Sequence, residues 1–194
     1  MRKFYFLVIA ICFLVGCGGI PIRSLPKLMK LENNLLTANP AEFMVAIQVD
    51  NHMVPPPNTA PLLILKISPN KAGAFEVIER KIPMHFIVVS ANALGLKPPS
   101  LDRKWLIYNL PSESQADLLG IQNYFKAIQN KSPKNGGGKI AIGIAQEGVA
   151  VKNPVFANTR WESWLQTSGQ EGFYELWSGT VSELLKQAET ARQE

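Results

Sequence analysis

Hydrophobic and polar residues alternate along much of the chain with the period of two that is typical of β-strands. Phe43, Val45, Ile47 and Val49 alternate with more polar or smaller neighbours, which predicts a strand with one buried face. The run of three prolines that follows predicts an extended loop. Further strands are predicted at residues 62–68, 75–79, 82–89, 104–110, 140–145 and 149–151, with Pro83 marking a bulge, an edge or a break. Residues 160–167 can be a strand, or a helix that would place Trp161 and Trp164 together.

The period changes to that of a helix at two places. Ser112 with Gln115 resembles a capping box, and the apolar spacing after it predicts a helix over about residues 113–130. Thr180 with Glu183 has the same pattern and predicts the start of a C-terminal helix. The apolar faces of these helices consist of Leu118, Ile121, Phe125 and Ile128 in the first, and Val181, Leu184, Leu185 and Ala188 in the second.

The order of these elements predicts a mainly β fold. About seven strands of similar length with one helix late in the order indicate an antiparallel β-sandwich, immunoglobulin-like in architecture, with one inserted amphipathic helix and a C-terminal helix. The alternative is an antiparallel α+β layer fold. Strands and helices do not alternate, which argues against a parallel doubly wound sheet.

The N-terminal segment has the order of an export signal. Two basic residues precede an apolar run that is too short to cross a bilayer as a permanent helix. The run ends in Leu14-Val15-Gly16-Cys17, which resembles the lipobox of bacterial lipoproteins. That resemblance implies a diacylglyceryl group on Cys17, cleavage after Gly16 and acylation of the new amino terminus. In enterobacterial lipoproteins, an aspartate directly after the cysteine retains the protein in the inner membrane. This chain has Gly18 at that position, so the resemblance also favours the outer membrane, facing the periplasm.

We therefore expect a signal peptide at residues 1–16, a lipidated tether at residues 17–40 and one globular β-rich domain at residues 41–194. Cys12 leaves with the signal peptide, and the lipid consumes the thiol of Cys17. The mature protein then has no thiol for disulfides, metal binding or nucleophilic catalysis. The leucines of the tether either dock on the domain, which we favour, or lie on the membrane surface; they are Leu25, Leu28 and Leu31.

The charge of the mature part is mild. The chain has 20 basic and 15 acidic side chains, and two of the basic ones lie in the signal peptide, so 18 basic and 15 acidic side chains remain, a balance of +3. A balance this small does not indicate a nucleic-acid partner. The partners we expect are the lipid bilayer, through acylated Cys17, and an envelope protein or peptidoglycan.

Residues suited to catalysis are few. A catalytic zinc site normally has three protein ligands, so His52 and His85 would have to converge with a carboxylate such as Asp50. We expect instead a polar turn at the first histidine, a structural role for the second, and no metal ion or cofactor. No Gly-x-Ser-x-Gly motif occurs, and the glycine run at residues 136–138 precedes a strand rather than a helix. A periplasmic hydrolase or metal-binding protein that uses Asp50, His52 and His85 is the alternative function.

An aromatic tract near the C-terminus offers the candidate binding residues. Such rings usually belong to a core, but exposed rings stack on sugars or dominate protein interfaces. If residues 160–167 form a strand, Trp161 and Trp164 lie on opposite faces and one is left outside the core. Trp161, Trp164 and Trp177 are therefore the candidate residues for binding a partner or a glycan, with Trp164 the sharpest. The favoured function is a non-enzymatic binding or structural module of the cell envelope.

Overall fold

The computed structural model of the chain describes residue 35 and residues 37–72, 75–131 and 138–191. The predicted signal peptide, Cys17, the tether as far as residue 34 and most of the glycine run lie outside the described residues. The described part contains 3-10 helices η2 (Pro40–Glu42), η3 (Ala91–Leu94) and η4 (Pro154–Phe156) in its connections. Its strands and α-helices are β1 (Met44–Asp50), β2 (Leu62–Pro69), β3 (Ile78–Pro83), β4 (His85–Ile87), β5 (Arg103–Asn109), α3 (Ser112–Lys131), β6 (Gly138–Ala145), β7 (Arg160–Gln166), β8 (Tyr174–Thr180) and α4 (Val181–Ala191).

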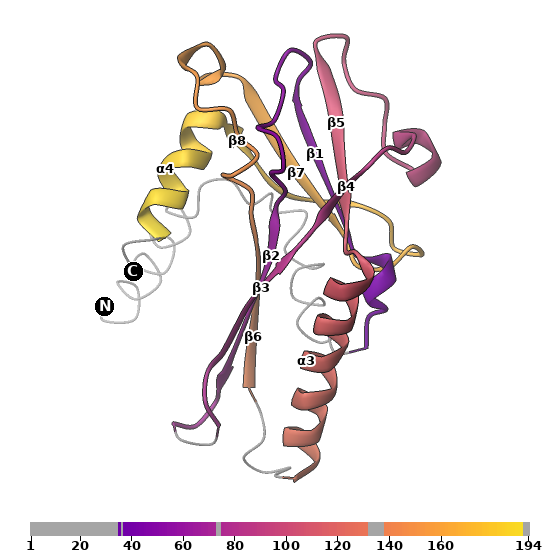
Figure 1. The fold of residues 1–194 in the computed structure, drawn as a ribbon, viewed down its shortest axis with the longest axis vertical. Helices are drawn as coiled ribbons and strands as arrows, with labels where there is room; N and C mark the ends of the chain where they lie inside the picture. Colours follow the sequence, from indigo (N-terminus) through magenta and orange to yellow (C-terminus); the bar gives the residue numbers. More distant parts are fainter. Residues whose placement is uncertain (1–34, 36, 73–74, 132–137, 192–194) are drawn as a thin grey trace, which may run out of the picture.

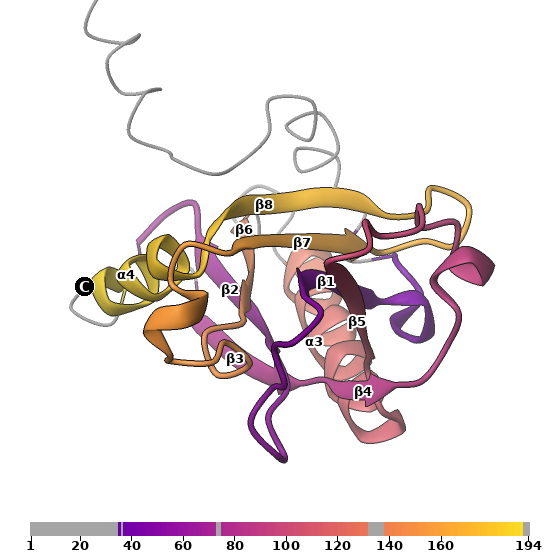
Figure 2. The same cartoon turned by 90° about the horizontal axis from the view of Figure 1, so that it is seen from above.

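Five strands form one antiparallel sheet in the order β4-β5-β1-β7-β8 (Figure 2). β1 lies in the middle and pairs along its length with β5 and β7. Its alternating sequence predicts one buried face, but residues 45–49 are all buried. The reason is a second, small cluster on the outer face, where Ala46 and Ile107 pack beneath Leu96 from the connection that precedes β5. The centre of this sheet is therefore covered on both sides.

The other three strands form an antiparallel sheet in the order β3-β2-β6, which extends beyond the five-stranded sheet (Figure 1). One stretch of chain joins the two sheets, because β3 ends at Pro83 and β4 begins two residues later. Pro83 has no amide hydrogen for a ladder, and the amide of Met84 donates to the carbonyl oxygen of Pro61 at 3.2 Å. The buried side chain of Met84 thus sits at a corner where the chain changes sheets.

The main hydrophobic core lies between the sheets and is completed by the helices. α3 and α4 flank the three-stranded sheet from opposite sides (Figures 1 and 2). Leu118 and Phe125 of α3 are buried in the core, and the ring of Phe125 meets that of Phe75 edge to face with a centroid distance of 6.0 Å. Tyr108 of β5 is also buried there, and burial raises its pKa to about 12.

The mainly β, antiparallel prediction is confirmed, and both helices occur where their apolar periods predict them. Of the three alternatives left open for Pro83, the structure shows a break directly after it, at the end of the edge strand β3. Among the residues that the structure describes, no helix is both long and apolar enough to span a membrane.

Four local predictions differ from the structure. The strands predicted at residues 75–79 and 82–89 are observed at Ile78–Pro83 and His85–Ile87. Residues 149–151 are not a strand, because the chain turns there with the amide of Val149 donating to the carbonyl oxygen of Gln146 at 3.0 Å. Ser112 and Gln115 form no capping box; the side-chain amide of Gln115 instead donates to the carbonyl oxygen of Leu110 at 2.7 Å. β8 lies in the aromatic tract and has no counterpart among the predicted strands.

Candidate functional site

The polar residues of the alternative enzymatic site lie far apart. Asp50 pairs with Arg103 at the start of β5, whereas His85 pairs with Asn109 at its end, and six extended residues span about 20 Å. His52 is an exposed turn residue, 83% exposed, with Nδ1 3.2 Å from Oδ1 of Asp50. The structure therefore does not bring the three together. Within the described ranges, no group of three or more His, Cys, Asp or Glu side chains could hold a metal ion.

The two tryptophans of β7 lie on opposite faces of the sheet, as a strand at this position predicts. Trp161 is 0% exposed, and its Nε1 donates to Oε1 of Gln146 at 2.9 Å. This burial corrects the surface role expected of Trp161, because no face of its ring is open to a ligand. Trp164 is half-buried on the outer face and packs edge to face against Trp105 with a centroid distance of 6.2 Å. Its ring therefore helps to cover the sheet.

A charged cluster clamps three strands together on the same outer face. Nη1 of Arg103 donates to Oε1 of Glu162 at 3.0 Å, and Nη2 donates to the carbonyl oxygens of Gln48 and Arg160 at 2.7 and 3.2 Å. Arg160 forms a second ion pair with Glu162. Burial works to raise the pKa of Glu162, but the hydrogen bonds and charges of the two arginines outweigh it and hold that pKa below its ordinary value. Because these contacts connect three strands, the role of the cluster is structural.

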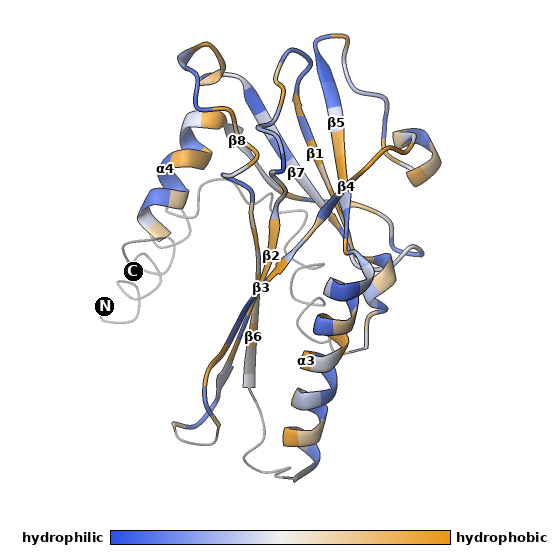
Figure 3. Cartoon of the chain, in the orientation of Figure 1, coloured by the Kyte–Doolittle hydropathy of each residue, from blue (hydrophilic) through white to orange (hydrophobic). Residues whose placement is uncertain are grey.

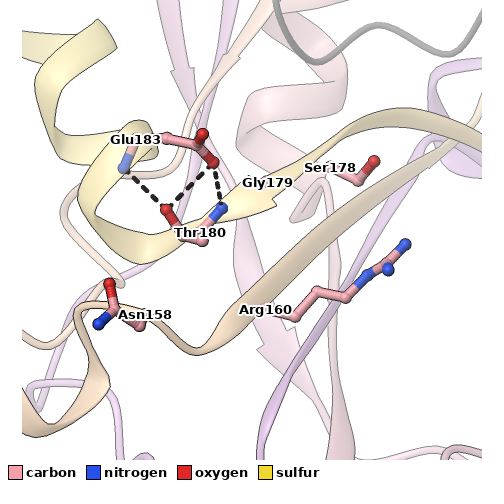
Figure 4. A pocket seen from close by; sticks show the side chains of 6 residues that line it. All are labelled: Asn158, Arg160, Ser178, Gly179, Thr180 and Glu183. Carbon is pink, nitrogen blue, oxygen red and sulfur yellow. Dashed lines mark hydrogen bonds between the residues drawn. The ribbon is translucent and has the colours of Figure 1, made fainter.

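A hollow of about 380 Å³ lies at the start of α4 (Figure 4). An open helix start attracts anions through its unpaired amide groups, but the first amides of α4 have partners. Those of Val181 and Ser182 donate to backbone carbonyl oxygens within residues 157–159, at 3.2 and 3.0 Å. The amide of Glu183 donates to Oγ1 of Thr180 at 3.3 Å, and Oε2 of Glu183 accepts from the amide of Thr180 at 2.7 Å. The predicted capping box is confirmed, and this hollow is a capped helix end.

Replacing Thr180 by alanine is expected to lower the free energy of unfolding by about 1 kcal/mol, because the amide of Glu183 loses its acceptor. Hydrogen bonds from the backbone amide and, second, from the side chain of Thr180 lower the pKa of Glu183; the variant loses only the side-chain bond, so it should move that pKa part of the way toward its ordinary value. Urea unfolding and an NMR titration measure the two effects. Thr190→Ala, further along the same helix, is the matched control, and equal stability of wild type and Thr180→Ala would contradict the capping role.

A larger hollow, about 510 Å³ in volume, lies between α4 and the three-stranded sheet; we call it the α4 groove. Residues of β2, β3 and β6 line one side, and residues of β8 and α4 line the other. The apolar lining consists of Ile64, Ile142, Gly143, Ile144, Ala145, Leu176, Trp177, Leu184, Ala188 and Ala191, and the polar lining of Glu79, Lys81, Gln146, Glu147 and Gln187.

Small residues on one face of β6 help to make the α4 groove hollow. Gly143 lies opposite Ile64 in the β2–β6 ladder, and a Cβ atom added at Gly143 would meet only Ile64, with its Cβ at 3.9 Å. Hydrophobic and hydrophilic residues alternate along the turns of α4 (Figure 3). Leu184 near its start is buried, whereas Ala188 is half-buried and Ala191 exposed, and all three line the groove.

Trp177 is one predicted binding residue that borders the α4 groove. It is 8% exposed, and in the described part of the chain its Nε1 has no hydrogen-bond partner. Too little of the ring is exposed for it to stack on a ligand. The stacking role expected of Trp177 is therefore corrected: its side chain forms part of the wall of the α4 groove. Sequence reasoning missed the other lining residues. The signals present were the alternation of small residues at Ala141, Gly143 and Ala145 and the apolar stripe of α4.

The α4 groove has the properties of an apolar binding site. Its volume falls within the range of about 300–1,000 Å³ that is usual for ligand pockets. Most of its lining is aliphatic, and charges of both signs border it on Glu79, Lys81 and Glu147. Comparisons with protein-family models, curated proteins and solved structures found no match to the chain.

Proposed function

We propose that this chain is a non-enzymatic binding module of the bacterial cell envelope, anchored to the outer membrane through acylated Cys17 and facing the periplasm. Its α4 groove receives apolar side chains from a protein partner. The observation that carries the proposal is the mainly aliphatic lining of this groove, which favours apolar contact over the polar and aromatic contacts that recognise a glycan.

The shape of the lining suits a polypeptide segment. Leu184, Ala188 and Ala191 follow one another at the i, i+4 and i+7 positions of α4, so one side of the groove is a helix face. Charges of both signs beside it can orient the polar flanks of a bound segment. As architecture, we propose a variant of the immunoglobulin-like sandwich in which the stretch through Pro83 links the two sheets.

Photocrosslinking from the groove tests this function. A photoreactive p-benzoylphenylalanine replaces Ala191, which is exposed and lines the groove, in cells that produce the full chain. Illumination is expected to give one discrete protein adduct. Gly143→Ile fills the groove from the β6 side and should lower the adduct yield about tenfold, since a bound apolar side chain loses its space.

The matched control is Ala141→Ile, which adds the same side chain to the same face of β6 outside the groove lining. It should leave the yield unchanged. Isoleucine is favoured over glycine in strands, so urea unfolding should show Gly143→Ile to be at least as stable as wild type. An adduct that forms equally well in both variants would contradict the proposal.

A further inference from the structure

The outer edge of β4 is apolar, exposed and unpaired. In the described part of the chain β4 pairs with β5 alone, through His85–Ile87, and forms one border of the five-stranded sheet (Figure 2). The exposed hydrophobic side chains here are Phe86 at 45%, Val88 at 94% and Val89 at 38%. The stretch from β4 toward η3 is among the hydrophobic parts of the chain (Figure 3).

This edge lacks the charged side chains that usually keep sheet edges apart, although β4 itself is only three residues long and closely follows Pro83. Soluble proteins protect such strands with lysine and other charged residues, with proline, or by keeping the strand short. β3, the border strand of the other sheet, follows that rule with Glu79, Arg80 and Lys81. Residues 82–96, in contrast, contain no Asp, Glu, Lys or Arg. The β4 edge therefore carries no charge that would repel a second strand.

The sequence of the edge is complementary to itself. If two copies pair antiparallel about a two-fold axis at Ile87, Phe86 of each lies opposite Val88 of the other on one face. Aromatic and β-branched residues form favourable cross-strand pairs, and this arrangement covers the two most exposed hydrophobic side chains of the segment, Phe86 and Val88. On the other face Ile87 meets its own copy, and His85 lies opposite Val89. Every pair avoids like charges.

We infer that β4 pairs with β4 of a second copy of this chain, so that two five-stranded sheets become one continuous sheet across a two-fold axis. The pairing extends β4 through Val89. It uses a surface separate from the α4 groove, which is lined by β2, β3, β6, β8 and α4. The dimer therefore does not depend on the function proposed for the groove.

Disulfide trapping tests the dimer in the full chain. Ile87→Cys places two cysteines on the two-fold axis with Cα atoms about 4.5–5.5 Å apart, a separation that a disulfide can span. The expected result is a linked species of twice the protomer mass in oxidised envelopes. Wild type, which retains Cys12 and Cys17 in its sequence, controls for linkage through those residues.

A second test of the dimer uses Val88→Lys, made with and without Ile87→Cys. Because Val88 is 94% exposed, the substitution should leave the fold intact while weakening self-association by about tenfold or more. Val155→Lys, at a 77% exposed position in η4, should leave it unchanged. Sedimentation in detergent measures the mass of the assembly for the proteins that lack Ile87→Cys. A monomeric wild type, a dimer that survives Val88→Lys, or linkage to a different protein would each overturn the inference.

Discussion

Replacing Arg103 by methionine is expected to lower the free energy of unfolding by about 3 kcal/mol at neutral pH. The side chains of Arg103 and Glu162 are 12% and 13% exposed, so within the described part of the chain the change leaves a largely buried carboxylate with only the more exposed Arg160 as its partner. The carbonyl oxygen of Gln48 also loses its donor from Arg103. Urea unfolding at pH 7 measures the loss.

The pH dependence identifies the charge as the cause. The folded-state pKa of Glu162 is lowered, so the stability it contributes is present above its unfolded pKa near 4.5 and is lost as pH falls through the lower folded value. The difference between wild type and Arg103→Met should therefore shrink below about pH 4. The double variant Arg103→Met/Glu162→Leu should recover most of the loss at pH 7. If the free energies of unfolding of wild type and Arg103→Met differed equally at pH 7 and pH 3.5, lost packing rather than the lost charge would be responsible for the destabilisation.

Gly179→Ala is expected to lower the free energy of unfolding by a similar amount, about 3 kcal/mol. An added Cβ atom would lie 2.6 Å from Cη2 and 2.7 Å from Cζ2 of Trp177, and 2.8 Å from Oε2 of Glu183. The carboxylate can move, but Trp177 is buried and its ring is held in the core. The substitution therefore strains the Trp177 wall of the α4 groove and the capping box of α4 together.

The control for this prediction is Gly120→Ala in the middle of α3. Beyond its chain neighbours and its own helix backbone, no described atom lies within 4 Å of a Cβ added there, and alanine is the better helix former, so the variant should gain about 0.5–1 kcal/mol. Thermal and urea unfolding of the two variants compare the effects. A Gly179→Ala variant as stable as wild type would show that the tryptophan ring can shift freely.

The elements of the fold were predictable where a repeating period decides them. The alternation around Val45 and the helical spacing around Leu118 each gave one element at nearly its observed bounds, because a buried face imposes its period on the sequence. Strand partners were not predictable, since β1 lies between β5 and β7 through contacts between distant parts of the chain. The wrong prediction of a strand at residues 149–151 has the same origin: the buried apolar residue Val149 packs in the core without forming a ladder.

The candidate site was predictable only in part. The aromatic tract drew attention to Trp177, which does border the α4 groove, but aromatic content alone could not tell a wall residue from an exposed ring. The groove depends on the pairing that sets Gly143 opposite Ile64 and on the place of α4 beside that sheet. The alternation of small residues in β6 has meaning only once that pairing is known. Lipidation at Cys17 stays a prediction from the lipobox resemblance.

The measurement that tests the groove most directly is the affinity of the crosslinked partner, once purified, for wild type, Gly143→Ile and Ala141→Ile. We predict that filling the groove at Gly143 weakens binding about tenfold or more, while Ala141→Ile binds as wild type does. Equal affinity for all three proteins would contradict the assignment of the α4 groove as the binding site.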